Sequence, residues 1–339
     1  KKKITLSLNK RIYKMKIILK INFIFLLSLS NIYYSTELRA NSISPGIVFQ
    51  ILASELSALY GDFQIASQTY LDISKKTNNP EAAKRATELA LTIGDHSTAL
   101  EAAKIWKLNS SDDLAATEAI HALYLVLGKN EDLINSMIVE RDKAFNENRL
   151  ELFYAQLSNL VNKARNPKDS LMIFEKISEN DQLLPDVLYS KAMLNYKVGN
   201  NLKMENILRK LIDLKPDHAQ ALNALGYTLA ENNKNLDEAL RLVKAAIVFL
   251  PGDPHIIDSV GWVYFKLGEL DKAEEWLSLA FSSQPDPEIS AHYGEVLWNL
   301  SSKDEALNVW RQGFKANPNN SVLLETLSRL KISIDNLAN

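Results

Sequence analysis

The stretch IDSVGWVYFKLGELDKAEEWLSLAFSSQP, residues 257–285, decides the fold of this chain. Its first half places Ile257, Val260 and Tyr264 at intervals of three and four, which is the spacing of one face of a helix. Gly261 leaves no side chain where a neighbouring helix must come close. The first half therefore predicts a helix that packs tightly against a second one.

The second half of the stretch predicts that partner helix. Asp271 is placed to cap it by accepting a hydrogen bond from an unpaired backbone N–H. Ala273 and Ala280 are small residues set to meet the first helix, with Leu277 between them. Pro285 cannot continue a helix and ends the pair. Together the two halves predict an antiparallel helical hairpin.

The same pattern recurs with a period near 34 residues. The segments DEALRLVKAAIVFLP (237–251), DKAEEWLSLAFSSQP (271–285) and DEALNVWRQGFKANP (304–318) align without gaps. Weaker copies extend the series backwards. One second-helix position is occupied in turn by Ala66, Ala99, Leu133, Ser170, Met204, Ala239, Ala273 and Ala306. Because one hairpin cannot bury its apolar face alone, stacking of neighbouring hairpins is predicted.

We therefore predict an all-α chain of about eight helix-turn-helix hairpins. No strands are expected, since no stretch alternates at period two. The steps of the series run from 33 to 37, and the step of 37 marks an irregular repeat at residues 141–184. N-terminal hairpins are expected in residues 41–140, regular repeats in residues 185–318, and a capping helix with a tail in residues 319–339.

Glycine, aromatic, alanine and proline at these offsets resemble the tetratricopeptide repeat, which residues 254–285 match at nearly every position. The resemblance implies a right-handed superhelical solenoid whose first helices line a concave groove for protein or peptide partners. By resemblance, the groove positions hold Tyr189, Asn223, Tyr227, His255, Asp258, Trp262, Phe265, Lys266, Glu295 and Trp298. Glu231 and Glu288 occupy such positions as well.

Aromatic side chains at groove positions have two possible roles. They would give a partner large rigid surfaces, or they would pack against the adjacent hairpin and complete the core. Both roles stay open for Trp262 and Phe265, whereas packing is favoured for Tyr227. Tyr264 and Trp310 occupy packing positions and are expected in the core.

Residues 1–40 are interpreted as a targeting segment rather than as part of the folded domain. Lysines precede the apolar run INFIFLLSL, residues 21–29, and a polar region ends at Ala40, which is the order of a secretory signal peptide. Residues 1–14 resemble an upstream extension before Met15. The apolar run is short for a bilayer, which needs about 20 residues, so a cleaved signal and a periplasmic protein are favoured over an uncleaved inner-membrane anchor.

Composition and charge narrow the classes of function. Apolar residues make up 46% and charged residues 24%, as in ordinary folded proteins, and there is no cysteine for disulfides or thiolate sites. Residues 1–40 hold nine bases and one acid, which leaves 30 bases, 40 acids and a net charge of −10 over residues 41–339. Because residues 41–339 carry this net negative charge, they repel phosphate backbones, and nucleic-acid binding is disfavoured.

Motifs for catalysis are missing from the sequence. The 11 glycines stand singly rather than in a phosphate-binding cluster, and neither G-x-S-x-G nor H-E-x-x-H occurs. His218, His255 and His292 are 37 residues apart while the repeats that hold them advance by 33 to 35, so they are interpreted as surface or groove histidines rather than metal ligands. We expect a chain that is not an enzyme and that needs no cofactor or metal.

A narrower resemblance suggests a role. The runs ELSALYGDFQIASQTY (55–70) and LNALGYTLAENN (222–233) are similar to proteobacterial envelope tetratricopeptide proteins. That resemblance implies an adaptor that recruits substrates to a cell-wall-related carboxyl-terminal processing protease. The adaptor type carries a lipid on a cysteine, which this chain lacks, so a soluble periplasmic form or an uncleaved anchor is implied. The alternative is a structural accessory subunit of an envelope assembly or polysaccharide export machine.

Overall fold

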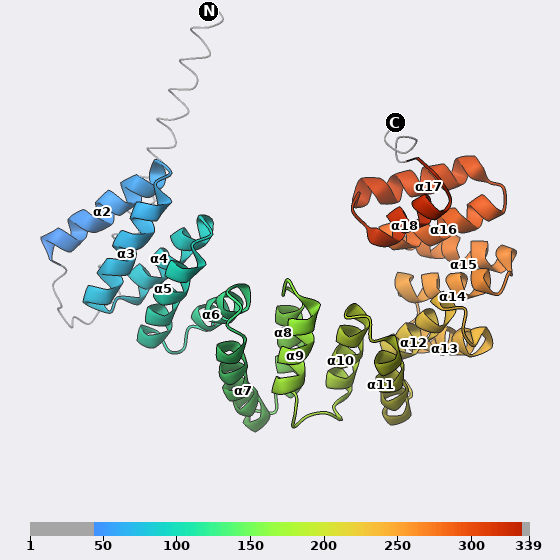
Figure 1. Ribbon diagram of the computed structural model, residues 1–339, viewed down its shortest axis with the longest axis horizontal. Coiled ribbons are helices and arrows are strands. Elements are labelled where there is room, and N and C mark those ends of the chain that lie inside the picture. The colour runs from blue at the N-terminus through green and yellow to red at the C-terminus, as the bar shows by residue number, and fades with distance from the viewer. Residues whose placement is uncertain (1–43, 334–339) are drawn as a thin grey trace, which may run out of the picture. The chain divides into compact units, whose positions relative to one another are not determined.

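The computed structural model describes residues 44–333, which form 17 helices and, within that range, no strand (Figure 1). The predicted signal peptide and its upstream extension lie outside the described residues. The helices are α2 (Pro45–Leu59), α3 (Phe63–Thr77), α4 (Pro80–Thr92), α5 (His96–Asn109), α6 (Leu114–Val126), α7 (Asn130–Asn146), α8 (Leu150–Val161), α9 (Pro167–Ile177), α10 (Pro185–Lys197), α11 (Asn201–Leu214), α12 (Ala219–Glu231), α13 (Leu236–Phe249), α14 (Pro254–Lys266), α15 (Leu270–Ser283), α16 (Pro287–Asn299), α17 (Lys303–Ala316) and α18 (Ser321–Arg329).

Consecutive helices pair as eight hairpins, from α2 with α3 to α16 with α17, and α18 follows as a single terminal helix. Each residue of the predicted second-helix series, from Ala66 to Ala306, lies on the second helix of its hairpin and is at most 3% exposed. Tyr264 and Trp310 are also buried, as expected. The predicted all-α array of helical hairpins is therefore confirmed.

The chain divides into two compact units between Asp113 and Leu114. In the first unit, α2 to α5 enclose a core that includes Ala66 and Leu89. In the second unit, one core runs without interruption from α10 to α16 and includes Leu208, Leu225 and Leu277. The domain limits drawn from the sequence stay predictions. Within residues 44–333, none of the helices has both the length and the apolar character that crossing a bilayer requires.

The predicted cap at Asp271 is wrong. Helix α15 begins one residue earlier, at Leu270, and the side chain of its N-cap residue Glu269 makes no capping hydrogen bond. Asp271 lies in the first turn, where its negative charge is favoured by the helix dipole. The side-chain cap of this hairpin lies instead at the start of its first helix, α14. Asp253 accepts the backbone N–H groups of His255 and Ile256 at the start of α14.

Replacing Gly261 with alanine is expected to destabilise the second unit by about 1–3 kcal/mol. A Cβ atom at this position would lie 2.6 Å from Leu277 Cγ and 3.1 Å from the Leu277 backbone nitrogen, so α15 would have to move. Gly46→Ala is the control, because there the nearest atom, Ser44 Oγ, is 3.8 Å away. Denaturant unfolding should show the control unchanged or slightly stabilised. Equal losses for both variants would contradict close packing at Gly261.

Candidate functional site

The first helices of the last hairpins and the terminal helix pack in succession, α12 against α14, α14 against α16, and α16 against α18. Residues one repeat apart therefore meet across neighbouring first helices. We call the side of α10, α12, α14, α16 and α18 on which these residues lie the first-helix face, and the name includes both its buried and its accessible residues. It contains the predicted groove residues, from Tyr189 on α10 to Trp298 on α16.

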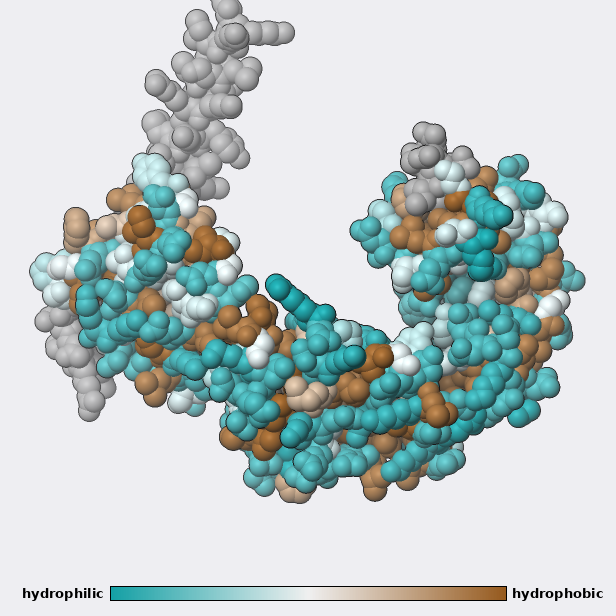
Figure 2. Space-filling view, in the orientation of Figure 1, coloured by the Kyte–Doolittle hydropathy of each residue, from teal (hydrophilic) through white to brown (hydrophobic). Residues whose placement is uncertain are grey.

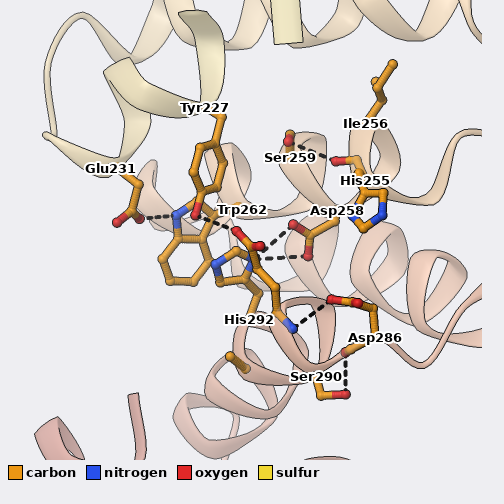
Figure 3. A network of polar contacts seen from close by, with 12 residues as sticks. Tyr227, Glu231, His255, Ile256, Asp258, Ser259, Trp262, Asp286, Ser290 and His292 are labelled. Carbon is orange, nitrogen blue, oxygen red and sulfur yellow. Dashed lines mark hydrogen bonds and ion pairs between the residues drawn. The ribbon is translucent and has the colours of Figure 1, made fainter. Parts of the chain in front are cut away.

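A buried ion pair joins α14 to α16 in this face (Figure 3). The Nδ1 atom of His292 lies 3.0 Å from Oδ1 and 2.9 Å from Oδ2 of Asp258. The two side chains are only 2% and 5% exposed. A charged carboxylate is costly to bury alone, so the histidine stabilises Asp258 by supplying a proton and a positive charge.

Aromatic rings enclose the histidine. The Trp262 indole stacks on the His292 ring with centroids 4.0 Å apart, and the Tyr227 ring lies 5.9 Å away (Figure 3). The polar atoms of both rings are used as well. Trp262 Nε1 donates to Glu231 at 2.5 Å, and the Tyr227 hydroxyl donates to Glu288 at 3.2 Å. We call Tyr227, Glu231, Asp258, Trp262, Glu288 and His292 the His292 network.

The environment of His292 favours its charged form. Burial alone lowers the pKa of the imidazole, but the charge and hydrogen bond of Asp258, with Glu288 and Glu231 farther away, raise this pKa above its usual value. The pKa of Tyr227 is raised far above its ordinary range, chiefly by burial and then by the charge of Glu288. Tyr227 is therefore a neutral hydrogen-bond donor at every physiological pH.

A second ion pair joins α16 to α18. Arg329 donates to the two carboxylate oxygens of Glu295 at 2.7 and 2.6 Å. The Glu295 side chain is 4% exposed, whereas that of Arg329 is 56% exposed. Hydrogen bonding to Glu295 raises the pKa of Arg329 further above its ordinary value. A planar, two-bond contact of this kind fixes the orientation of the terminal helix on its neighbour.

The predicted groove residues differ in accessibility. Asp258 and Trp262 are 4% exposed and Glu295 is 3% exposed. His255 is exposed, and the remaining residues are partly buried, namely Tyr189, Asn223, Tyr227, Phe265, Lys266 and Trp298. A binding role for these residues stays a prediction.

Several of the partly buried residues pack on one another. Phe265 stacks on Trp262 with centroids 4.9 Å apart, and Lys266 Nζ lies 4.8 Å from the centre of the same indole. Trp298 contacts the buried Trp310, and Tyr189 lies against His218. Of the two roles that the sequence left open for Trp262, the structure shows packing, because its indole is buried between Phe265 and His292.

Two residues of the site escaped the sequence interpretation. His292 was expected to be an ordinary surface or groove histidine but is 1% exposed, and that expectation is wrong. Arg329 was not singled out at all. Both follow their acidic partners by 34 residues, one repeat length. Opposite charges at that spacing are the signal that would have found them.

Acidic groups gather at the accessible part of the first-helix face. The pKa of Tyr196, whose side chain is 48% exposed, is raised by partial burial and then by the charges of Glu231, Glu288 and Glu325. We call Tyr196 and these three glutamates the acidic rim. Its residues come from α10, α12, α16 and α18. Lys266 Nζ, 3.6 Å from Glu231, offsets one of these charges in part.

Metal ligands do not converge on these residues in the part of the chain that is described. Between residues 44 and 333, no three His, Asp or Glu side chains converge as metal ligands would. A surface pocket lined by Leu171, Met172 and Val198 lies elsewhere, between α9 and the α10–α11 turn. The face therefore offers charge, aromatic surface and hydrogen bonds to a partner that lies against it.

Comparison with known proteins finds similarity to the tetratricopeptide repeat in part of the chain. Two models, both described as tetratricopeptide repeat, match residues 189–254 and 257–287. A TPR repeat-containing protein of Pseudomonas aeruginosa is 38% identical over 157 residues, covering 45% of this chain and 26% of that protein. The Hsp70-Hsp90 organizing protein 1 of Glycine max is 26% identical over 264 residues, covering 73% of this chain and 42% of that protein. The chain thus spans less than half the length of either relative.

Solved structures with a similar arrangement are also tetratricopeptide proteins. A TPR protein of Thermus thermophilus is 20% identical with a TM-score of 0.44, covering 59% of this chain and 100% of that one. One from Parabacteroides merdae is 15% identical with a TM-score of 0.45, covering 87% of this chain and 100% of that one. Residues 189–254 and 257–287 thus resemble the tetratricopeptide repeat in sequence, in the same region where the structure forms stacked helical hairpins.

Proposed function

We propose that this chain is a non-catalytic, exported scaffold that binds a protein partner on its first-helix face. The partner we propose is a carboxyl-terminal processing protease of the cell envelope together with the substrates it cleaves. The order of charged, apolar and polar residues in 1–40 supports export, and the resemblance of residues 55–70 and 222–233 to envelope adaptors supports the partner.

The observation that carries the proposal is the acidic rim. Glu325 is exposed and Glu288 is partly exposed, while the side chain of Glu231 is 41% exposed and Tyr196 is 48% exposed. Carboxylates beside an aromatic ring attract the Lys or Arg side chains of a bound segment through charge and cation–π contact. We therefore propose that the bound segment of the partner is basic.

Site-specific photocrosslinking in cells tests this proposal. Tyr196 is the position for the photoreactive residue, because Trp262 is too deeply buried to reach a partner. A photoreactive residue at Val248 is the control, since Val248 is 73% exposed and lies on the second helix α13. We expect adducts with a protease or its substrates from Tyr196 and none of these from Val248. Adducts with a stable membrane assembly would instead favour the structural-subunit alternative.

Charge reversal gives a second readout on the same surface. Glu288→Lys with Glu325→Lys is expected to weaken partner binding about tenfold or more, and added salt should weaken binding to the wild type. Glu275→Lys, at an exposed position on the second helix α15, is the matched control. Equal binding by all three proteins would remove the acidic rim from the proposal.

A further inference from the structure

Helix α2 presents apolar side chains on two opposite faces. Its inner face packs into the core of the first unit through Ile47, Ile51 and Ala58. Its outer face carries a row of exposed side chains that we call the α2 stripe, Phe49 (72% exposed), Leu52 (43%), Leu56 (56%) and Leu59 (62%). Hydrophobic surface is visible over this helix in Figure 2. A contiguous apolar row of this kind marks an interaction site.

The two ends of the hairpin array contrast sharply. At the other end, α18 buries Leu323 and Leu327 and exposes Ser321, Glu325, Ser328 and Arg329, which is how a terminal helix remains soluble. The α2 stripe holds no polar residue. The first hairpin therefore has an outer face of the kind that a neighbouring helix covers in the rest of the array.

The spacing of the stripe fits a second copy of itself. Its residues are separated by three, four and three positions, the seam of a two-helix coiled coil. The pattern is also symmetric about residue 54. An antiparallel copy related by a two-fold axis would set Phe49 against Leu59 and Leu52 against Leu56 of the second chain.

The stripe itself carries no charge that would oppose the same occupant. The one charged residue of α2, Glu55, is already held within its own chain by Arg85 at 2.9 and 3.0 Å and by the Tyr70 hydroxyl at 2.8 Å. The stripe is therefore neutral, so contact made there buries no charged side chain of α2, even though residues 41–339 as a whole carry a net charge of −10. A charged partner would find nothing to pair with on the stripe. We propose that two copies of this chain associate through α2, antiparallel and stripe to stripe.

Sedimentation of the protein, in the form that cells produce, tests this proposal over a wide range of concentration. We expect a dimer whose dissociation constant rises at least about 100-fold in Leu56→Glu, because each copy would then bury a carboxylate against Leu52 of the other. Leu202→Glu, on α11 at a side chain 71% exposed, is the control and should remain a dimer. Circular dichroism checks that both variants fold like the wild type, as expected for exposed positions.

Disulfide trapping gives the orientation and does not depend on a disruptive variant. The chain has no cysteine of its own, so Leu52→Cys and Leu56→Cys each introduce a single thiol. A mixture of the two variants should form the mixed disulfide in preference to either self-disulfide. A monomer at every concentration, a dimer that Leu56→Glu leaves intact, open-ended oligomers, or preferred self-disulfides would overturn the proposal.

Discussion

Replacing Asp258 with alanine is expected to lower the free energy of unfolding of the second unit by about 3–5 kcal/mol near pH 6, because it leaves His292 buried without its partner. Urea unfolding of the purified protein measures the loss. Asp271→Ala is the control, since Asp271 is exposed and should change stability by at most about 1 kcal/mol. Losses of equal size would mean that the buried pair contributes no more than a surface charge.

A double replacement separates the pair from the space it fills. Asp258→Leu together with His292→Phe removes both charges while keeping side-chain volume against Trp262. Because two apolar groups of similar shape leave no charge unpaired, the double variant is expected to recover most of the stability that Asp258→Ala loses. If the double variant is as unstable as Asp258→Ala, the loss comes from disturbed packing against Trp262 and not from an unpaired buried charge.

The same pair predicts a dependence on pH. The folded-state pKa of His292 is raised above the value of about 6.5 in an unfolded chain. The stabilisation is therefore complete below about pH 6.5 and is lost as pH rises through the folded-state pKa. His218 has the opposite dependence, because burial and then the charge of Lys215 lower its pKa below about 6.5. Its contribution to stability is therefore present above about pH 6.5 and is lost as pH falls through the folded-state pKa. His292→Phe should abolish the fall above pH 6.5 and leave the acidic change in place.

The repeat was predictable because burial recurs at a fixed spacing. Ala66 and Ala306 mark the ends of a series in which every member is buried on a second helix. The cap at Asp271 was not predictable in the same way, because the start of a helix depends on the backbone of the preceding turn. There Glu269, with φ −87° and ψ 70°, already holds the N-cap position.

The sequence predicted which helices carry the residues of the candidate site, but not how deeply those residues are buried. Position within the repeat places Trp262 and Asp258 on the first-helix face, yet exposure depends on how closely α16 approaches α14. His292 closes that gap, and its pairing with Asp258, one repeat earlier, is not revealed by its 37-residue spacing from the other histidines. Long-range pairing is seen in the sequence only when the repeat length is used as the distance between partners.

Under the proposed function, the buried and the accessible parts of this face have different roles. Asp258 with His292 and Glu295 with Arg329 fix successive first helices on one another, while Glu325 and Tyr196 remain accessible. A binding surface that is rigid before contact loses less entropy when the partner arrives. Glu288 belongs to both parts, since it accepts the Tyr227 hydroxyl and also lies on the acidic rim.

A comparable loss, again about 3–5 kcal/mol, is expected when Asp181 is replaced with alanine. Asp181 follows α9 in the irregular stretch and accepts hydrogen bonds from Arg141 of α7 at 2.5 and 2.6 Å and from the buried Tyr154 hydroxyl of α8. The side chains of Arg141 and Asp181 are only 12% and 8% exposed. Removing the carboxylate would leave the buried Tyr154 hydroxyl and the Nε and Nη2 groups of Arg141 without their acceptor.

The matched control uses the same arginine. Asp142 also contacts Arg141, at 2.9 Å, but is 61% exposed, so Asp142→Ala should cost at most about 1 kcal/mol. Burial raises the pKa of Asp181, but its hydrogen bonds to Arg141 and Tyr154 lower this pKa by more than burial raises it. The net result is a pKa below the ordinary value near 3.9. The stabilisation is therefore present above about pH 4 and is lost as pH falls through the folded-state pKa. Acid unfolding that is identical in Asp181→Ala and the wild type would contradict this assignment, because the variant has no carboxylate left to protonate.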